Sequence, residues 1–165
     1  MTESTITRFL ATEADTLALG GELAPCLFGG MVVYLSGELG AGKTTLARGM
    51  LRALGHIGRV KSPSYALVEP YKLSKLYLYH FDFYRFTESK ELEEAGFREY
   101  FSQETVCLVE WPENAKDLLP AADLTLRLAT AGSGRRVPRR PAASPAGGAS
   151  ATTRAPVRTP GENTA

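Results

Sequence analysis

The sequence has few cysteines, little net charge and no long apolar run, and each shortage excludes a class of protein. Two cysteines in 165 residues cannot make the disulfide framework of a small secreted domain. No apolar stretch approaches the length of a membrane span, and the N-terminus lacks the pattern of a signal peptide. We therefore expect a cytoplasmic protein without membrane contact, with Cys26 and Cys107 as buried free thiols among apolar neighbours.

The net charge of +1 conceals an uneven distribution along the chain. Residues 1–131 contain 13 basic and 17 acidic side chains, whereas residues 132–165 contain six arginines and one glutamate. A mildly acidic body argues against a dedicated nucleic-acid-binding domain, because phosphate contacts need a basic face. The length and the 44% hydrophobic content suit a single domain with a proper core.

What the chain does contain is a complete phosphate-binding loop at Gly37–Thr44, with the pattern G-x-x-x-x-G-K-[ST]. The preceding run Met31–Leu35 is apolar and rich in β-formers, which is typical of a strand buried on both faces. The following segment Leu46–Leu54 has apolar residues at helical spacing, and Gly55 supplies a stop. This strand–loop–helix order predicts a nucleoside triphosphate site.

Each part of this loop has a chemical role in holding phosphates. The small residues Gly40–Gly42 let backbone N–H groups turn inward around an anion without a Cβ clash. A helix that begins near Lys43 adds the positive end of its dipole to the same place. Lys43 can reach the β- and γ-phosphates, the Thr44 hydroxyl can ligate Mg²⁺, and Thr45 can bind the α-phosphate.

The remaining segments predict an α/β fold of the P-loop NTPase type, with three layers and a mixed, mainly parallel sheet. Strands are expected at residues 5–10, 66–71, 76–84, 105–111 and 124–128, with a first helix opened by a capping box at Thr12–Asp15 and a short acidic helix at 88–96. The link Lys72–Lys75 is too short for a parallel crossover, so the strands around it must form an antiparallel hairpin.

Two acidic residues close predicted strands. Asp82 follows the apolar run Leu76–Phe81, and Glu110 follows Val106–Val109. Ligands of open α/β sheets gather at the carboxyl ends of the strands, where the loop also lies, so both acids are expected at the metal. Spacing does not separate their roles: one can ligate the metal while the other orients water, or one can pair with Arg85.

Several neighbouring residues have both a functional and an ordinary interpretation. His80 lies on the same strand face as Asp82, and a core histidine is the simpler interpretation. Trp111 can cover the nucleotide, anchor a partner or cap the sheet. Ser62 and Ser64, in the polar connection after the loop helix, are candidates for a switch that senses the γ-phosphate, and a plain surface turn is the alternative.

Residues 132–165 differ in composition from the rest of the chain. They are rich in proline, alanine, arginine and serine and contain no aromatic residue. Such a segment cannot bury a core of its own. We therefore expect a P-loop ATPase domain at 1–131 and a disordered tail at 132–165. The simplest interpretation gives this tail no function, and a spacer or a weak RNA contact is the alternative.

The motifs of the chain occur in a distinctive order. They are GELGAGKTTLARG at Gly37–Gly49, VKSPSY at Val60–Tyr65, LVEPY at Leu67–Tyr71, HFDFYR at His80–Arg85, ELEEAG at Glu91–Gly96 and VEWPE at Val109–Glu113. Together they resemble the TsaE (YjeE) family of small bacterial ATPases of tRNA threonylcarbamoyladenosine synthesis. The resemblance runs from about Thr12 to Arg136.

The resemblance implies an ATPase with ATP or ADP and Mg²⁺ as cofactors. Its partners would be TsaB and TsaD, which modify adenosine 37 of tRNAs reading ANN codons, and it would meet tRNA only through that complex. In the family the ATPase cycle is thought to reset the TsaB–TsaD complex rather than to transfer the threonylcarbamoyl group. Carried over, the catalytic residues are Lys43, Asp82 and Glu110, and the metal residues are Thr44 and Glu110.

The resemblance also implies a nucleotide-binding set and a switch. The nucleotide would be bound by Gly40, Ala41, Gly42, Lys43, Thr44 and Thr45, with Glu13, Gly134 and Arg135 nearby, and the switch would contain Ser62 and Ser64. The chain departs from the family at Ser64 and Ala66, where threonines are usual, and from Pro138 onward, where family members continue into a further strand.

Two other functional classes share a phosphate-binding loop. A small-molecule kinase would need an acceptor pocket and usually an arginine-bearing lid, and the predicted hairpin and the lack of an obvious lid weigh against it. A nucleotide-dependent binding module with negligible hydrolysis is the other class. The variants Asp82→Ala and Glu110→Ala separate it from an ATPase. In an ATPase these substitutions abolish ATP turnover while ATP still binds.

Overall fold

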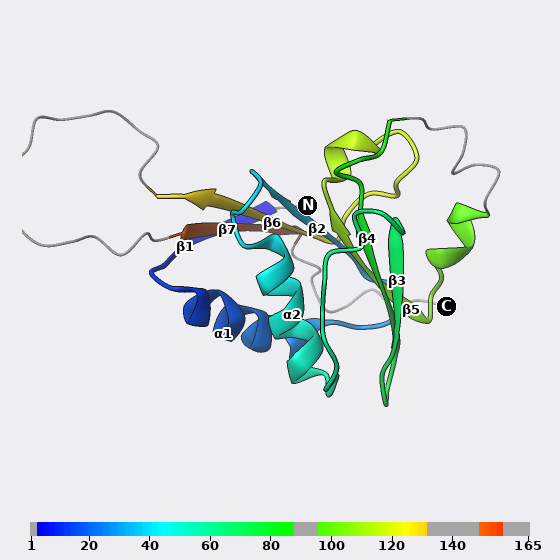
Figure 1. Cartoon of the computed structure of the whole chain (residues 1–165), viewed down its shortest axis with the longest axis horizontal. Helices are drawn as coiled ribbons and strands as arrows, with labels where there is room; N and C mark the ends of the chain where they lie inside the picture. Colours follow the sequence, from blue (N-terminus) through cyan, green and yellow to red (C-terminus); the bar gives the residue numbers. More distant parts are fainter. Residues whose placement is uncertain (1–2, 88–95, 132–148, 157–165) are drawn as a thin grey trace, which may run out of the picture.

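The apolar run ahead of the phosphate loop forms a central strand of a seven-stranded sheet (Figure 1). This computed structural model describes residues 3–87, 96–131 and 149–156. Its strands are β1 (Glu3–Leu10), β2 (Val32–Gly37), β3 (Val68–Lys72), β4 (Tyr77–Asp82), β5 (Thr105–Glu110), β6 (Leu124–Thr130) and β7 (Ala149–Pro156). Its helices are α1 (Glu13–Leu23) and α2 (Lys43–Ala53), with short 3₁₀ turns η1 (Ala24–Cys26), η2 (Phe97–Tyr100) and η3 (Pro112–Asn114).

The strand order is β1-β7-β6-β2-β5-β4-β3. β2 pairs in parallel with β5 and β6, and β4 pairs in parallel with β5. β3 is antiparallel to β4, which confirms the predicted hairpin. β7 is antiparallel to both β6 and β1, so β1 runs in the direction of the central strands. The predicted mixed, mainly parallel α/β sheet is therefore confirmed.

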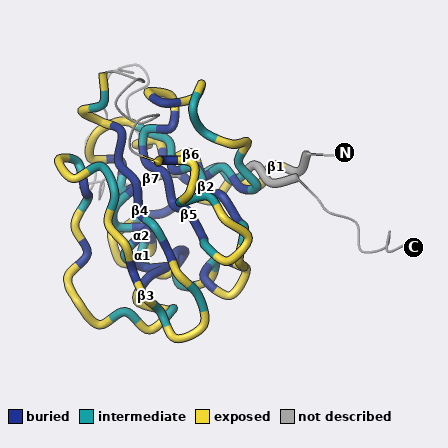
Figure 2. Tube along the Cα trace, turned by 90° about the vertical axis from the view of Figure 1, so that its right-hand side faces the viewer, coloured by how far each residue is buried: buried dark blue, intermediate teal, exposed yellow. Residues whose placement is uncertain are grey.

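Both faces of the central strands are buried, because their side chains alternate between two cores. On β2, Val33 and Leu35 pack with the apolar residues of α1 and α2, whereas Val32 packs in a second cluster with Phe81 and Phe97. The rings of Phe81 and Phe97 meet edge to face, with centroids 5.4 Å apart. Figure 2 shows the buried stretches concentrated in these strands and the exposed ones in the connections. Helices, sheet and the aromatic segment form three layers.

The helix α1 supports the helix that follows the phosphate loop. It begins with the predicted capping box: the Asp15 N–H donates to Thr12 Oγ1 (3.1 Å), and Asp15 Oδ2 accepts from the Thr12 N–H (2.9 Å). A Cβ on Gly49 of α2 would lie 2.3 Å from the Leu17 carbonyl oxygen of α1. Glycine at this position therefore lets the two helices pack at close range, side by side in Figure 1.

The strand β7 is the main departure from the sequence-based expectation. It lies within the expected tail, so the expectation of disorder is wrong for residues 149–156. Ala151 is buried and lies in register with Leu128 of β6 and Arg8 of β1. Small and β-branched residues need no core of their own when two neighbouring strands pair with their backbone. The other tail residues, 132–148 and 157–165, lie outside the described part of the chain.

The two cysteines differ in exposure. Cys107 is buried as expected, and burial raises the pKa of its thiol to about 12. The expectation for Cys26 is wrong, because η1 leaves its side chain exposed. Of the acidic helix expected at 88–96, only Gly96 falls within the described residues. Among the described helices, none has the length and apolar character to cross a bilayer.

Insertion of β7 predicts that one face of this strand tolerates no charge. Ala151→Asp buries an unpaired carboxylate and should lower the free energy of unfolding in urea by about 3 kcal/mol or more. The matched control is Thr152→Asp, which places the same charge beside the exposed Arg127 on the opposite face and should cost little. Equal, small effects at both positions would show that residues 149–156 do not occupy this place in the sheet.

Candidate functional site

The phosphate loop joins the carboxyl end of β2 to the first turn of α2, as its pattern predicts. Gly42 is the N-cap of α2 and has a left-handed backbone (φ 107°) that a side chain would strain. The first N–H groups of an α-helix have no acceptor within the helix. Because α2 begins at Lys43, directly after the loop, its N-terminal N–H groups and the positive end of its dipole lie at the loop, which is the usual arrangement for binding an anion.

The Lys43 ammonium is folded back onto its own loop. Its Nζ donates to the carbonyl oxygens of Gly37 (2.5 Å) and Glu38 (2.8 Å), and it lies 4.2 Å from the ring centroid of Trp111. Burial lowers the pKa of Lys43, while the carboxylates of Glu110, Glu113 and Asp82 act in the opposite direction. The loop therefore holds a cation that carbonyl dipoles, rather than a paired carboxylate, keep in place.

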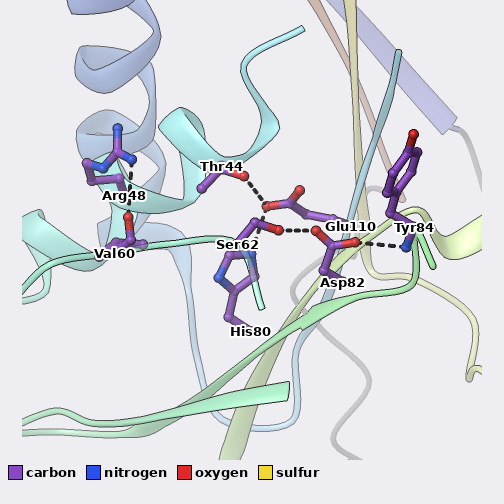
Figure 3. A network of polar contacts seen from close by, with 8 residues as sticks. All are labelled: Thr44, Arg48, Val60, Ser62, His80, Asp82, Tyr84 and Glu110. Atoms are coloured by element: carbon purple, nitrogen blue, oxygen red, sulfur yellow. Dashed lines mark hydrogen bonds and ion pairs between the residues drawn. The ribbon is translucent and has the colours of Figure 1, made fainter. Parts of the chain in front are cut away.

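Glu110, the last residue of β5, is buried against the loop (Figure 3). Its Oε1 accepts a hydrogen bond from the Thr44 hydroxyl (2.9 Å) and lies 2.8 Å from His80 Nε2. His80 was interpreted from the sequence as a core residue. It is fully buried, but it also contacts the acid that the sequence singles out.

Asp82, the last residue of β4, lies beside Glu110 in the parallel β4–β5 register. The Tyr84 N–H donates to its Oδ1 (2.8 Å), and the Ser62 hydroxyl donates to its Oδ2 (Figure 3). The two strand-end acids therefore lie at one edge of the sheet, next to the phosphate loop. Arg85 pairs with neither acid among the described contacts: its guanidinium lies over the ring of Tyr65, 4.4 Å from the centroid.

The two switch candidates have different contacts. Ser62 binds Asp82, whereas Ser64 lines the cleft. The turn that contains both is tied to Asp82 a second time: the Leu67 N–H donates to the Pro63 carbonyl (2.8 Å), and the Leu67 carbonyl accepts from the Asp82 N–H (3.0 Å). Leu67 has a left-handed backbone (φ 67°), a conformation that is strained for a branched side chain.

These elements enclose a cleft of about 490 Å³. Its lining includes most of the predicted site, namely Gly40, Gly42, Lys43, Thr44, Thr45, Ser62, Ser64, Asp82 and Glu110, together with Leu39, Tyr84, Arg85 and Trp111. The rings of Tyr84 and Trp111 lie 5.0 Å apart and form one wall. Tyr84 was missed in the sequence analysis, although it stands two residues after Asp82 and so follows the same strand edge.

Two of the predicted residues, Ala41 and Glu13, are not part of the cleft lining. Ala41 belongs to the loop, and its side chain is buried. Glu13 is exposed at the start of α1, where its Oε1 lies 3.8 Å from Nη1 of Arg48. Gly134 and Arg135 lie outside the described residues. Their predicted place beside the nucleotide stays a prediction.

The donor set at Thr44 and Glu110 fits Mg²⁺. A hydroxyl and a carboxylate are hard oxygen donors, and they already touch. Within the described residues, no group of three or more histidine, cysteine, aspartate or glutamate side chains is arranged to hold a metal alone.

A strand, phosphate loop and helix, with acids at the ends of the parallel strands β5 and β4, define the P-loop class of α/β proteins. A family model described as threonylcarbamoyl adenosine biosynthesis protein TsaE matches residues 10–137. The chain therefore belongs to the TsaE family.

Relatives and a solved structure agree with this assignment. The tRNA threonylcarbamoyladenosine biosynthesis protein TsaE of Haemophilus influenzae is 44% identical over 128 residues, which cover 74% of this chain and 81% of that protein. The protein of the same name from Bacillus subtilis is 40% identical over 107 residues, which cover 65% and 66%. The crystal structure of Bacillus subtilis YdiB has a TM-score of 0.69 and 27% identity, over 94% of this chain and 88% of that one. The predicted P-loop fold is thereby confirmed.

The two serines of the turn should differ in their contribution to stability. Ser62→Ala removes a hydrogen bond to a carboxylate and should lower the free energy of unfolding by about 1.5–3 kcal/mol. Ser64→Ala is the matched control and should change it by less than about 0.5 kcal/mol. Urea denaturation of the two variants measures the difference. If Ser64→Ala cost as much as Ser62→Ala, the Ser62–Asp82 contact would not hold the turn.

Proposed function

We propose that this protein binds Mg²⁺·ATP in the cleft and hydrolyses it in support of tRNA threonylcarbamoyladenosine synthesis. The observation that carries the proposal is the contact between the Thr44 hydroxyl of the phosphate loop and the Glu110 carboxylate at the end of the neighbouring strand. This contact places the two oxygen donors that a magnesium nucleotide needs beside the anion-binding end of α2. A cleft of about 490 Å³ is also of a size that small ligands occupy.

Each loop residue has a task in binding the nucleotide. The loop backbone and Thr45 hold the phosphates, and the Lys43 ammonium exchanges its two carbonyl acceptors for phosphate oxygens, which attract it more strongly. Thr44 and Glu110 would hold Mg²⁺, which neutralises the charge that develops on the phosphates. Trp111 and Tyr84 form an aromatic wall that limits access of water.

Hydrolysis additionally needs an oriented water, and we assign this task to Asp82. Its carboxylate lines the cleft beside Glu110 and is fixed by Ser62 and by the Tyr84 N–H. A carboxylate held in this way can accept a proton or a hydrogen bond from the attacking water. The two acids then have separate roles: Glu110 serves the metal, and Asp82 serves the water.

The nucleotide cycle acts, in this proposal, on the TsaB–TsaD complex in the cytoplasm. Family membership supports a role in threonylcarbamoyladenosine synthesis. The partner complex, and the contact with tRNA through it, are part of our proposal. The segment Ser62–Leu67 offers a physical route for coupling, because Tyr65 within it is exposed while Ser62 and Leu67, at its two ends, bind Asp82. A partner that contacts this segment would shift the water-orienting acid, and the state of the nucleotide would in turn change the segment.

The proposal is tested by phosphate release from Mg²⁺·ATP, alone and with added TsaB and TsaD. We expect release that rises with the partners and disappears in Lys43→Ala. Asp82→Asn keeps the shape of the site and should lower release about 100-fold or more while ATP still binds.

Two results would decide against the proposal. Release that does not depend on Lys43, with or without the partners, would contradict an ATPase at this site. Full activity in Asp82→Asn would remove the role of Asp82. Bound ATP without any release from the wild-type protein would instead identify a nucleotide-dependent binding module.

A further inference from the structure

His80, on β4, reaches the cleft only through another side chain. It is fully buried, between Glu69 of β3 and Leu108 of β5 in the sheet register, and it is not part of the cleft lining. Its Nε2 lies 2.8 Å from Glu110 Oε1. A nucleotide in the cleft would therefore not touch the imidazole, and any effect of His80 on the reaction must pass through Glu110.

The surroundings of the imidazole determine which nitrogen carries the proton. Nδ1 is buried and has no hydrogen-bond partner among the described residues. A proton on Nδ1 would thus be an unsatisfied buried N–H, which is costly. A carboxylate oxygen is an acceptor, so Nε2 must be the donor in its contact with Glu110. His80 therefore presents an Nε2–H to Glu110, and its Nδ1 is the nitrogen without a partner.

We propose that His80 is a positioning residue that fixes the carboxylate of Glu110 through this Nε2–H. Thr44 donates to the same Oε1, but its hydroxyl lies in the cleft lining and can rotate toward a ligand. The enclosed imidazole has no such freedom. His80 is thus the donor that would keep Glu110 in place if the Thr44 hydroxyl turned toward a metal. This role rests on the proposed function, in which Thr44 and Glu110 hold Mg²⁺.

The contact leaves part of the Glu110 carboxylate free for a ligand. His80 Nε2 and the Thr44 hydroxyl both meet Oε1, so the described hydrogen bonds do not engage Oε2. In other proteins, metal ligands are commonly oriented by hydrogen bonds from residues that do not touch the metal. Mutation of those residues commonly lowers metal affinity 10–100-fold.

The first test is the imidazole tautomer, read by ¹⁵N NMR on the full chain. Only two histidines occur in the sequence, His56 and His80, and the spectrum of His80→Gln assigns them. We expect His80 signals that show a slowly exchanging proton on Nε2. A ring that carries its proton on Nδ1 and none on Nε2 would overturn the inference.

The second test compares variants by their affinity for ADP with Mg²⁺ and with EDTA. His80→Leu removes the donor and should reduce the Mg²⁺-dependent gain in affinity about tenfold or more, while affinity in EDTA stays unchanged. His80→Gln keeps an N–H donor and should retain most of the gain. His56→Gln is the matched control, since His56 packs against Tyr71 away from the cleft lining.

The outcomes separate this inference from the proposed function. A full Mg²⁺-dependent gain in His80→Leu, or an equal loss in His80→Leu and His80→Gln, would reduce His80 to a packing role. A wild-type protein that binds no Mg²⁺·ADP would contradict the proposed function, and the tautomer would then decide the inference alone. The tautomer likewise decides if His80→Leu does not fold.

Discussion

The parallel register of β2, β5 and β4 is the constraint on which the rest of the site depends. In this register Leu35 lies beside Glu110, and Glu110 lies beside Asp82, so three strands end at one edge of the sheet. The phosphate loop leaves β2 at the same edge and returns into α2. The apolar side chains that pair and pack these strands therefore place the acids opposite the loop, and local sequence supplies only the chemistry at each end.

The polar groups that this register brings together stabilise one another. Lys43, His80, Asp82 and Glu110 are each at most 4% exposed, and burial of any of them without a partner would be costly. Carbonyl oxygens hold the ammonium, and hydroxyl, amide and imidazole donors hold the carboxylates. Among the described residues, no lysine or arginine lies within hydrogen-bond distance of either acid. The site therefore keeps two carboxylates and one ammonium unneutralised, facing the cleft in which we propose that a magnesium nucleotide binds.

The sequence predicted those features that depend on residues close together in the chain. The loop at Gly37–Thr44, the hairpin and the capping box of α1 follow from spacing and turn length, and the structure contains all of them. β7 was missed because its stability comes from backbone pairing with β1 and β6, which lie far away in the sequence. The contact of His80 with Glu110 was missed for a related reason: strand spacing gives the face of a side chain, but only the sheet register gives its neighbour.

The most direct test of this account is a crystal structure of the protein with Mg²⁺ and a non-hydrolysable ATP analogue. The account predicts phosphates on the loop, the metal at Thr44 and Glu110, and the Lys43 ammonium moved from the Gly37 and Glu38 carbonyls to phosphate oxygens. A nucleotide bound elsewhere, or one on the loop with Lys43 still on its carbonyls and no metal at Glu110, would contradict it.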